Sequence, residues 1–254
     1  MIPPKKSAAF VWRMETMLDL YEGPYDPLFP VVCFDERPCQ LLAEVRESLP
    51  VETGRPERRD HEYERRGTAH VSVAFEPLSG WRRASVTERR RGREFAEEVR
   101  RLVEEDYSEA DRVRLVCDNL STHSAAAFYE TFPPEVARRL TRKVEFVYTP
   151  VHGSWLNMVE IEISVLARQC LKRRIPDIET LGREVSAWCE ARNRSKASVE
   201  WRFTTEDART KLRKLYPSFE PCRRTRADQT RGPAPRAAPP RRRTGSWLLP
   251  GRRR

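Results

Sequence analysis

Apolar runs and amphipathic stretches alternate over the first 220 residues of the chain. Apolar runs bounded by polar residues predict five strands, at 31–34, 68–76, 81–87, 112–117 and 144–148. Helical spacing and helix-starting residues predict six helices, over 7–21, 93–107, 133–140, 160–172, 177–193 and 204–216. This order of elements predicts an α/β fold, with a mixed sheet flanked by helices.

Two of the apolar runs are followed directly by an aspartate. Asp35 follows the first run, and Asp118 follows the run at 112–117. If these strands are parallel neighbours, both aspartates lie at the sheet edge where open α/β sheets place their chemistry. A third acid, Glu160, falls in the first turn of a downstream helix, where the helix dipole favours an anion. Bare carboxylates gathered there would be costly, and a divalent metal ion offsets that cost.

Each of these residues also has a purely structural interpretation. An aspartate after a strand is often a turn former or a helix cap, and Asp118 suits such a turn. Asn157 could cap the helix that carries Glu160, which would then complete a weak capping box. A lone histidine in the position of His123 is more often a cap or surface residue than a catalyst. For each residue taken singly, the structural interpretation is the commoner one.

Two other acids, Glu36 and Glu162, are alternatives to Asp35 and Glu160. Glu36 points to the opposite face of the sheet from Asp35 if the strand continues past it. Glu162 lies about 200° around the helix from Glu160. The helix face that carries Glu160 also carries the small or apolar side chains of Ser164, Ala167 and Leu171, and it is predicted to pack on the sheet. The helix face that carries Glu162 also carries Leu166, Gln169 and Arg173, and it is predicted to be more exposed to solvent. This comparison favours Glu160 as the third acid.

Two longer segments, Cys117–His123 and Tyr148–Glu160, together with Val-Cys-Phe-Asp-Glu around Asp35, resemble a known family. They are similar to the catalytic core of bacterial insertion-sequence transposases of the IS-six-thirty family, in the mariner-like superfamily. The resemblance runs from about residue 7 to about residue 217 and implies a ribonuclease H-like fold. It implies DNA transposition by metal-dependent strand cleavage and strand transfer.

In that family the counterparts of Asp35, Asp118 and Glu160 are catalytic, so the resemblance assigns these three residues to catalysis. Two Mg²⁺ (or Mn²⁺) ions bound by the same three carboxylates are expected, because both ions prefer oxygen ligands. Polar residues of the same motifs are expected to support the site or to face DNA, namely Asn119, His123, His152 and Asn157. Clustered arginines are candidates for contacts with the DNA backbone, namely Arg82, Arg83, Arg89, Arg90 and Arg91.

The formal net charge of +10 belongs to the end of the chain. Residues 221–254 contain eleven arginines and one aspartate, whereas residues 1–220 carry 37 basic and 37 acidic residues. The sequence predicts a linker helix remnant over 1–27, a catalytic domain over 28–217, and a disordered Arg/Pro-rich tail over 218–254. A basic pI is therefore not evidence of a basic catalytic body.

The six cysteines lack metal-site spacing and are predicted to be reduced, in a bacterial cytoplasmic protein. No apolar run is long enough to span a membrane. The expected partners are DNA, as transposon ends and target, and a second copy of the chain, with no small-molecule substrate. Transposases of the family carry an amino-terminal helix-turn-helix module, which is not found here. An inactive remnant that dimerises with an intact copy or inhibits it is therefore the alternative function.

The charge distribution predicts that the tail supplies most of the non-specific DNA affinity. Deleting Pro221–Arg254 should leave the fold unchanged and remove most binding to a random duplex in a mobility-shift assay. Binding by the intact chain should fall steeply with salt, because each phosphate contact releases roughly one counterion. Tight binding of a terminal-repeat duplex over random DNA by the shortened protein would show instead that residues 1–220 read sequence.

Overall fold

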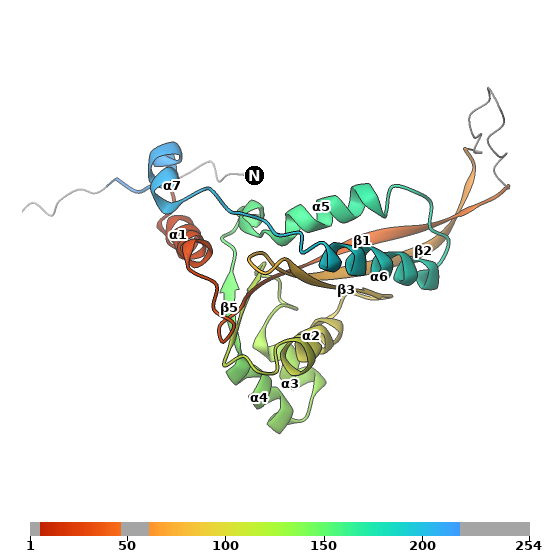
Figure 1. Ribbon diagram of the computed structural model, residues 1–254, viewed down its shortest axis with the longest axis horizontal. Coiled ribbons are helices and arrows are strands. Elements are labelled where there is room, and N and C mark those ends of the chain that lie inside the picture. Colours follow the sequence, from red (N-terminus) through yellow and green to blue (C-terminus); the bar gives the residue numbers. More distant parts are fainter. Residues whose placement is uncertain (1–5, 47–60, 219–254) are drawn as a thin grey trace, which may run out of the picture. The chain divides into compact units, whose positions relative to one another are not determined.

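A five-stranded mixed sheet forms the centre of the protein (Figure 1). The computed structural model describes residues 6–46 and 61–218. The sheet has the strand order β3-β2-β1-β4-β5. Its strands are β1 (Val31–Glu44), β2 (Tyr63–Glu76), β3 (Trp81–Thr87), β4 (Val113–Cys117) and β5 (Val144–Tyr148). The first three strands pair antiparallel, whereas β4 lies parallel to both β1 and β5. The predicted mixed α/β sheet is confirmed.

Strand β1 is much longer than the apolar run that predicted it. It continues through Asp35 to Glu44 because β2 pairs with it over most of this length. Its parallel pairing with β4 covers only Val31–Cys33. Pro38 lies in the part of β1 that pairs with β2 alone, which is where a residue without an N–H is tolerated. Asp35 therefore lies inside a strand, two residues beyond the end of the parallel pairing.

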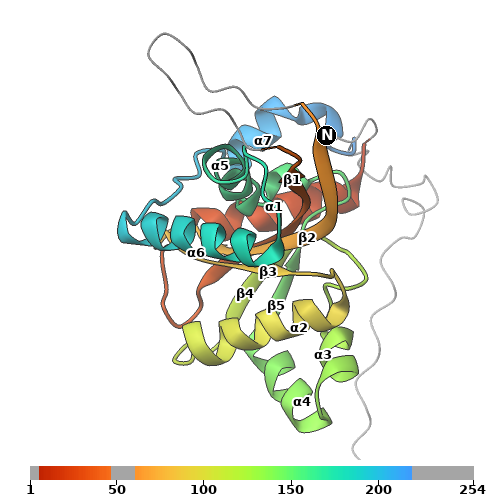
Figure 2. The same ribbon diagram turned by 90° about the vertical axis from the view of Figure 1, so that its right-hand side faces the viewer.

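Helices cover both faces of the sheet. Over the described ranges the α-helices are α1 (Ala8–Glu22), α2 (Gly92–Arg101), α3 (Ala125–Thr131), α4 (Pro134–Lys143), α5 (Val159–Gln169), α6 (Ile178–Arg194) and α7 (Thr205–Lys211). A π-helical turn, Leu102–Asp106, extends α2, and short 3₁₀ turns cover Ser154–Leu156 and Arg213–Leu215. Figure 2 shows α5 and α6 on one face and α2, α3 and α4 on the other.

The two faces of the sheet bury separate apolar clusters. Val32 and Phe34 of β1 pack with α2, α3 and α4, whereas Cys33 packs on the side of α1, α5 and α6. Successive side chains of a strand point to opposite faces, so Asp35 lies on the α5 side and Glu36 on the α2 side. The predicted separation of these two acids is confirmed by the continuing strand.

Helix α1 is part of the packed core. It begins after Ser7, whose hydroxyl accepts a hydrogen bond from the Phe10 N–H, as at many helix starts. Its buried residues join the cluster on the α5 side, namely Phe10, Met14, Met17, Leu18 and Tyr21. The Tyr21 hydroxyl donates to the Leu156 carbonyl at 2.8 Å. The helix thereby supports the turn that precedes α5.

By its internal packing the chain divides into Met1–Pro217 and Ser218–Arg254. The predicted tail lies outside the described residues apart from Ser218. Five of the six cysteines fall in the described ranges and are free thiols, and Cys222 lies outside them. Among the described helices, none is both long and apolar enough to cross a membrane.

The burial of α1 predicts a clear difference between two substitutions on this helix. Met17→Ala should lower the free energy of unfolding by about 2–5 kcal/mol, because the side chain is fully buried. Trp12→Ala should change it by no more than about 0.5 kcal/mol, because that side chain is 67% exposed. Urea unfolding followed by circular dichroism measures both. Equal effects would show that α1 does not belong to the core.

Candidate active site

The two predicted aspartates lie on neighbouring parallel strands. Asp118 directly follows β4, and Asp35 lies on β1 just beyond the residues that pair with β4. The Thr149 N–H donates to the Cys117 carbonyl at 3.0 Å and so holds the loop after β5 against the same end of β4. The carboxyl ends of the parallel strands therefore bring Asp35 and Asp118 to one edge, as the sequence predicted.

Glu160 reaches this edge from the first turn of α5. The turn is held against β1 by Asn157, which is buried and donates from Nδ2 to the Phe34 carbonyl at 3.0 Å. The Asn157 side-chain oxygen accepts from the Val159 N–H at 3.4 Å, and its carbonyl accepts from the Glu160 N–H at 3.1 Å. Asn157 thus connects the residue before Asp35 with the start of the helix that carries Glu160.

The three carboxylates act on one another electrostatically. Burial raises the pKa of Asp35 to about 7, and the negative charges of Glu160 and Asp118 add to this rise. The Glu36 N–H, which donates to Asp35 Oδ1 at 2.7 Å, and the charge of His123 act in the opposite direction without cancelling it. The buried position of Asp35 and the two neighbouring carboxylates therefore both disfavour its charged form.

This donor set has the chemistry of a site for a hard divalent cation. All three groups are carboxylates, which Mg²⁺ and Mn²⁺ prefer, and Asp35 and Glu160 form no ion pair with a Lys or Arg of the described ranges. Over the same ranges, no three His, Cys, Asp or Glu side chains are close enough to form a ready-made metal centre. Ion binding here would require the carboxylates to draw together.

The predicted environment of the α5 acids is wrong. Glu160 is exposed, whereas Glu162 is fully buried beside Val159, Ile163 and Leu166. Ion pairing explains the reversal, because a carboxylate is buried readily only when cations accompany it. The sequence pattern predicted that Glu162 is exposed to solvent, because periodicity does not reveal the basic residues that pair with it.

The partners of Glu162 are two arginines from different elements. Glu162 Oε1 accepts from Arg192 Nη2 at 2.5 Å, and Glu162 Oε2 lies 3.1 Å from Arg82 Nε. Both Arg82 and Glu162 have side chains that are 0% exposed. Glu162 therefore joins α5 to β3 and α6, and it is unavailable to a metal ion at the sheet edge.

His123 is buried and lies between two carboxylates. Its Nδ1 lies 2.5 Å from Asp118 Oδ1, and its Nε2 lies 3.6 Å from Glu36 Oε2. Phe34 and Phe95 pack against its ring. Burial lowers the pKa of His123, but the carboxylates of Asp118 and Glu36 outweigh it and raise the pKa to about 9. His123 is thus a cation at neutral pH that orients Asp118.

Glu36 and Tyr148 complete the surroundings of His123, and sequence reasoning assigned neither to this role. Glu36 also forms an ion pair with Arg90. The Tyr148 hydroxyl donates to the His123 carbonyl at 2.9 Å. Alternation along the strand places Glu36 on the opposite face of the sheet from Asp35. That pattern could have indicated that Glu36 supports the site from the α2 side. No sequence signal links Tyr148 to His123.

Asn119 and His152, the other two polar candidates, are exposed on the loops after β4 and β5. His152 adopts a left-handed backbone, with a φ of 64°. At Gly153 an added Cβ would lie 2.4 Å from Pro150 Cγ, so this tight turn requires a glycine. Among the described residues, no side-chain hydrogen bond joins Asn119 or His152 to the three carboxylates, and their expected support of the site stays a prediction.

The candidate DNA-binding arginines fall into two groups. Arg82 is buried with Glu162, which excludes a contact with DNA. Arg83 pairs with Glu105 and Asp106, and Arg90 pairs with Glu36. The exposed remainder, without a described ion pair, consists of Arg89 and Arg91. Arginines are long amphipathic side chains, so a dense run of them does not reveal which ones are buried.

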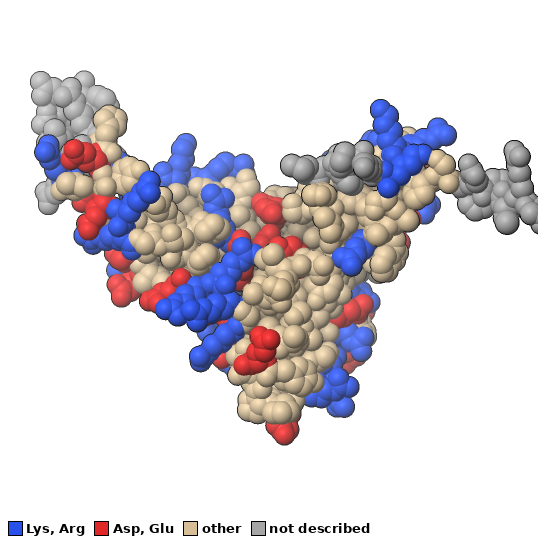
Figure 3. Space-filling view, turned by 180° about the vertical axis from the view of Figure 1, so that it is seen from behind, with Lys and Arg blue, Asp and Glu red and all other residues tan. Residues whose placement is uncertain are grey.

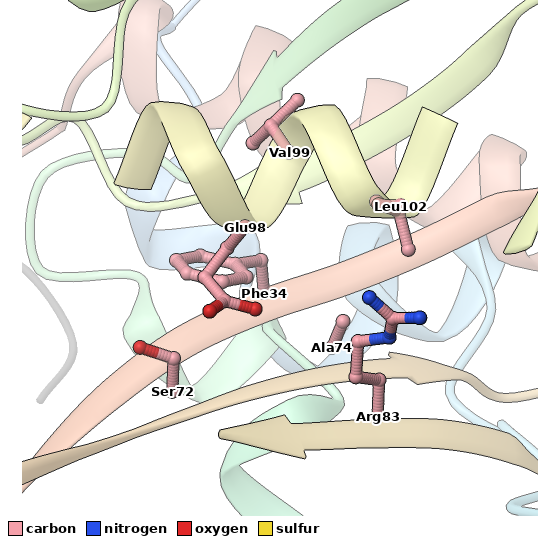
Figure 4. Close-up of a pocket in the computed structure, with 7 residues that line it drawn as sticks. All are labelled: Phe34, Ser72, Ala74, Arg83, Glu98, Val99 and Leu102. Atoms are coloured by element: carbon pink, nitrogen blue, oxygen red, sulfur yellow. The ribbon is translucent and has the colours of Figure 1, made fainter. Parts of the chain in front are cut away.

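Figure 4 shows Arg83 and Glu98 in the small space between β3 and α2, beside Phe34 and Leu102. The cavity measures about 10 Å³, which is room for about one water molecule. On the face drawn in Figure 3, acidic and basic side chains are interspersed. The mixed charges on this face fit the neutral formal charge of residues 1–220.

A mixed five-stranded sheet with helices on both faces and acids at the carboxyl ends of its central parallel strands has the ribonuclease H-like fold. Residues 30–182 match the DDE superfamily endonuclease family, and the chain belongs to this family. No curated protein matches the chain.

Solved structures of the Mos1 transposase share the fold. The pre-cleavage Mos1 transpososome matches with a TM-score of 0.54 and 15% identity, over 87% of this chain and 66% of that chain. The Mos1 strand transfer complex matches with a TM-score of 0.51 and 15% identity, over 87% and 65%. The mariner Mos1 paired end complex with Mg matches with a TM-score of 0.50 and 14% identity, over 86% and 66%. The chain thus spans slightly less than two thirds of these relatives.

The contrast between the two α5 acids predicts different stability effects. Glu162→Gln should lower the free energy of unfolding by about 3–5 kcal/mol, because it leaves two arginines around a neutral group. Glu160→Gln should not destabilise the fold, because the side chain is exposed and its negative charge opposes Asp35. Thermal and urea unfolding of both variants test this. A stable Glu162→Gln variant would contradict the described ion pairs.

Proposed function

We propose that the chain is the catalytic domain of a DDE-type transposase, which cleaves DNA strands and transfers them in a metal-dependent reaction. The observation that carries this proposal is the grouping of Asp35, Asp118 and Glu160 at one sheet edge, without an ion pair to any arginine or lysine of residues 6–46 and 61–218. Membership of the DDE superfamily endonuclease family supports a nuclease-type reaction. The motifs around the three acids support the narrower assignment to the bacterial IS-six-thirty family.

We assign the three carboxylates to two Mg²⁺ or Mn²⁺ ions. Asp35, Asp118 and Glu160 would hold these ions through their carboxylate oxygens. Bound ions of this kind activate an attacking water or 3′-hydroxyl and stabilise the leaving oxygen. The presence of Mg in a Mos1 complex of similar fold supports this choice of ion.

The surrounding residues of this chain position the carboxylates. His123 holds Asp118 by a charged hydrogen bond, and Asn157 fixes the start of α5 against the carbonyl before Asp35. Because these contacts set the orientation of the acids in advance, less reorganisation remains when ions and DNA bind. Buried Glu162 sets the rotation of α5, which directs Glu160 away from the packed face.

DNA is the proposed substrate, as transposon ends and target, and the working form is proposed to be a homodimer in the bacterial cytoplasm. The Mos1 structures of similar fold are a transpososome and a strand transfer complex, which supports DNA as partner. Residues 28–217 are the proposed extent of the catalytic domain.

Substitution of each acid tests the proposal. Asp35→Asn, Asp118→Asn and Glu160→Gln should each abolish Mg²⁺- or Mn²⁺-dependent nicking of duplex DNA while the protein stays folded, because each removes a metal ligand. Asp111→Asn is the matched control, since Asp111 is exposed before the amino end of β4. Product gels with labelled duplex and circular dichroism give the two readouts. A Glu160→Gln variant that nicks DNA like the wild type would remove Glu160 from the site.

A further inference from the structure

A cleft of about 360 Å³ lies between α1 and the loops that follow β4 and β5. Four residues of α1 and its cap line one side, namely Ser7, Ala9, Phe10 and Arg13. The two loops line the other side with Asn119, Pro150, Val151 and His152. Asn119 is the residue directly after Asp118, so the cleft begins beside the proposed catalytic edge. Figure 1 shows β5 pointing toward the end of the molecule where α1 lies.

The charge in this cleft is positive and not neutralised. Arg13 is half-buried and forms no ion pair with any described residue, and no acid lines the cleft. The next acid on α1, Glu15, is engaged by Arg209 and Tyr216 of the α7 region. Arg13 therefore keeps its charge for a ligand, whereas the other charged groups of α1 are used to hold α7.

The guanidinium of Arg13 acts on the carboxyl end of β5. Burial raises the pKa of Tyr148 to about 12, and the positive charge of Arg13 opposes this rise. The Tyr148 hydroxyl in turn donates to the carbonyl of His123, the residue that holds Asp118. Arg13 is thus placed close to the loops that carry the site without touching its carboxylates.

The remaining lining suits a nucleotide. Val151 is 69% exposed at the cleft and offers an apolar surface to a sugar or base. Asn119 and His152 are exposed and offer side-chain hydrogen bonds. A guanidinium beside such groups is a common arrangement for a DNA phosphate, because it combines charge with several N–H donors.

We propose that this cleft is a binding subsite for the DNA backbone next to the cleaved bond, with Arg13 as its phosphate contact. The subsite rests on the proposed function, since its lining residue Asn119 directly follows Asp118. It assigns to α1 a part in substrate binding in addition to its packing role.

Charge-removing and charge-keeping variants test the subsite, made both in the full-length chain and in the chain without Pro221–Arg254, because the shortened form lacks the binding expected of the tail. Affinity for a fluorescent 20-base-pair duplex is measured by anisotropy at several salt concentrations, with thermal unfolding as the check on folding. Arg13→Gln should weaken binding about tenfold, as expected for one lost charge-assisted hydrogen bond. It should also make the negative slope of log K against log salt shallower by about 0.9. Arg13→Lys should restore most of the affinity and most of the slope.

Arg138→Gln is the matched control. Arg138 is an exposed helical arginine on α4, before the amino end of β5, and forms no described ion pair. It should bind the duplex as the wild type does. An Arg13→Gln variant with unchanged affinity and slope, or an Arg138→Gln variant with an equal loss, would overturn the subsite. If the wild type binds duplex but does not nick it with Mg²⁺ or Mn²⁺, the catalytic proposal fails. The comparison of Arg13→Gln with the wild type then still shows whether the cleft binds DNA.

Discussion

The buried ion pairs of Glu162 are the constraint on which the arrangement of the site depends. A carboxylate that is fully removed from water must be matched by cations, and here these come from β3 and α6. Only one rotation of α5 about its axis points Glu162 at Arg82 and Arg192. That rotation places Glu160 on the opposite side of the helix, in the open. The position of the proposed third acid thus follows from the pairing of an acid that has no part in the chemistry.

A comparable support lies behind the first two acids on the other face of the sheet. Glu36 is nearly buried and pairs with Arg90 on the loop before α2. His123 lies between Glu36 and Asp118, so a cation shared by two carboxylates connects the α2 face with the sheet edge. Asn157 provides the matching connection on the α5 side, through the Phe34 carbonyl. Each proposed catalytic acid is therefore flanked by a buried polar group that is fixed in turn by the core.

The sequence predicted β3 and β5 over their observed ranges, because each of these strands is a short run with clear ends. The adjacency of Asp35 and Asp118 followed from the same pattern. The length of β1 and the burial of Glu162 and Arg82 could not be predicted, because both depend on partners distant in sequence. Strand β1 extends through polar residues only because β2 pairs with it. A charged residue looks exposed in a periodicity argument until its buried counterion is known.

The charged side chains discussed above fall into two classes: those that have an ion-pair partner of opposite charge within the fold, and those that have none among the described residues. Glu162, Glu36 and Asp106 have arginine partners and hold elements together. Asp35 and Glu160 have none in the described ranges, and burial, together with the charges of Glu160 and Asp118, raises the pKa of Asp35. Arg13, Arg89 and Arg91 likewise lack described acidic partners. Carboxylates without a basic partner can bind cations, and arginines without an acidic partner can bind anions. Divalent ions together with a phosphodiester backbone would neutralise both sets at once, which neither ligand alone would do.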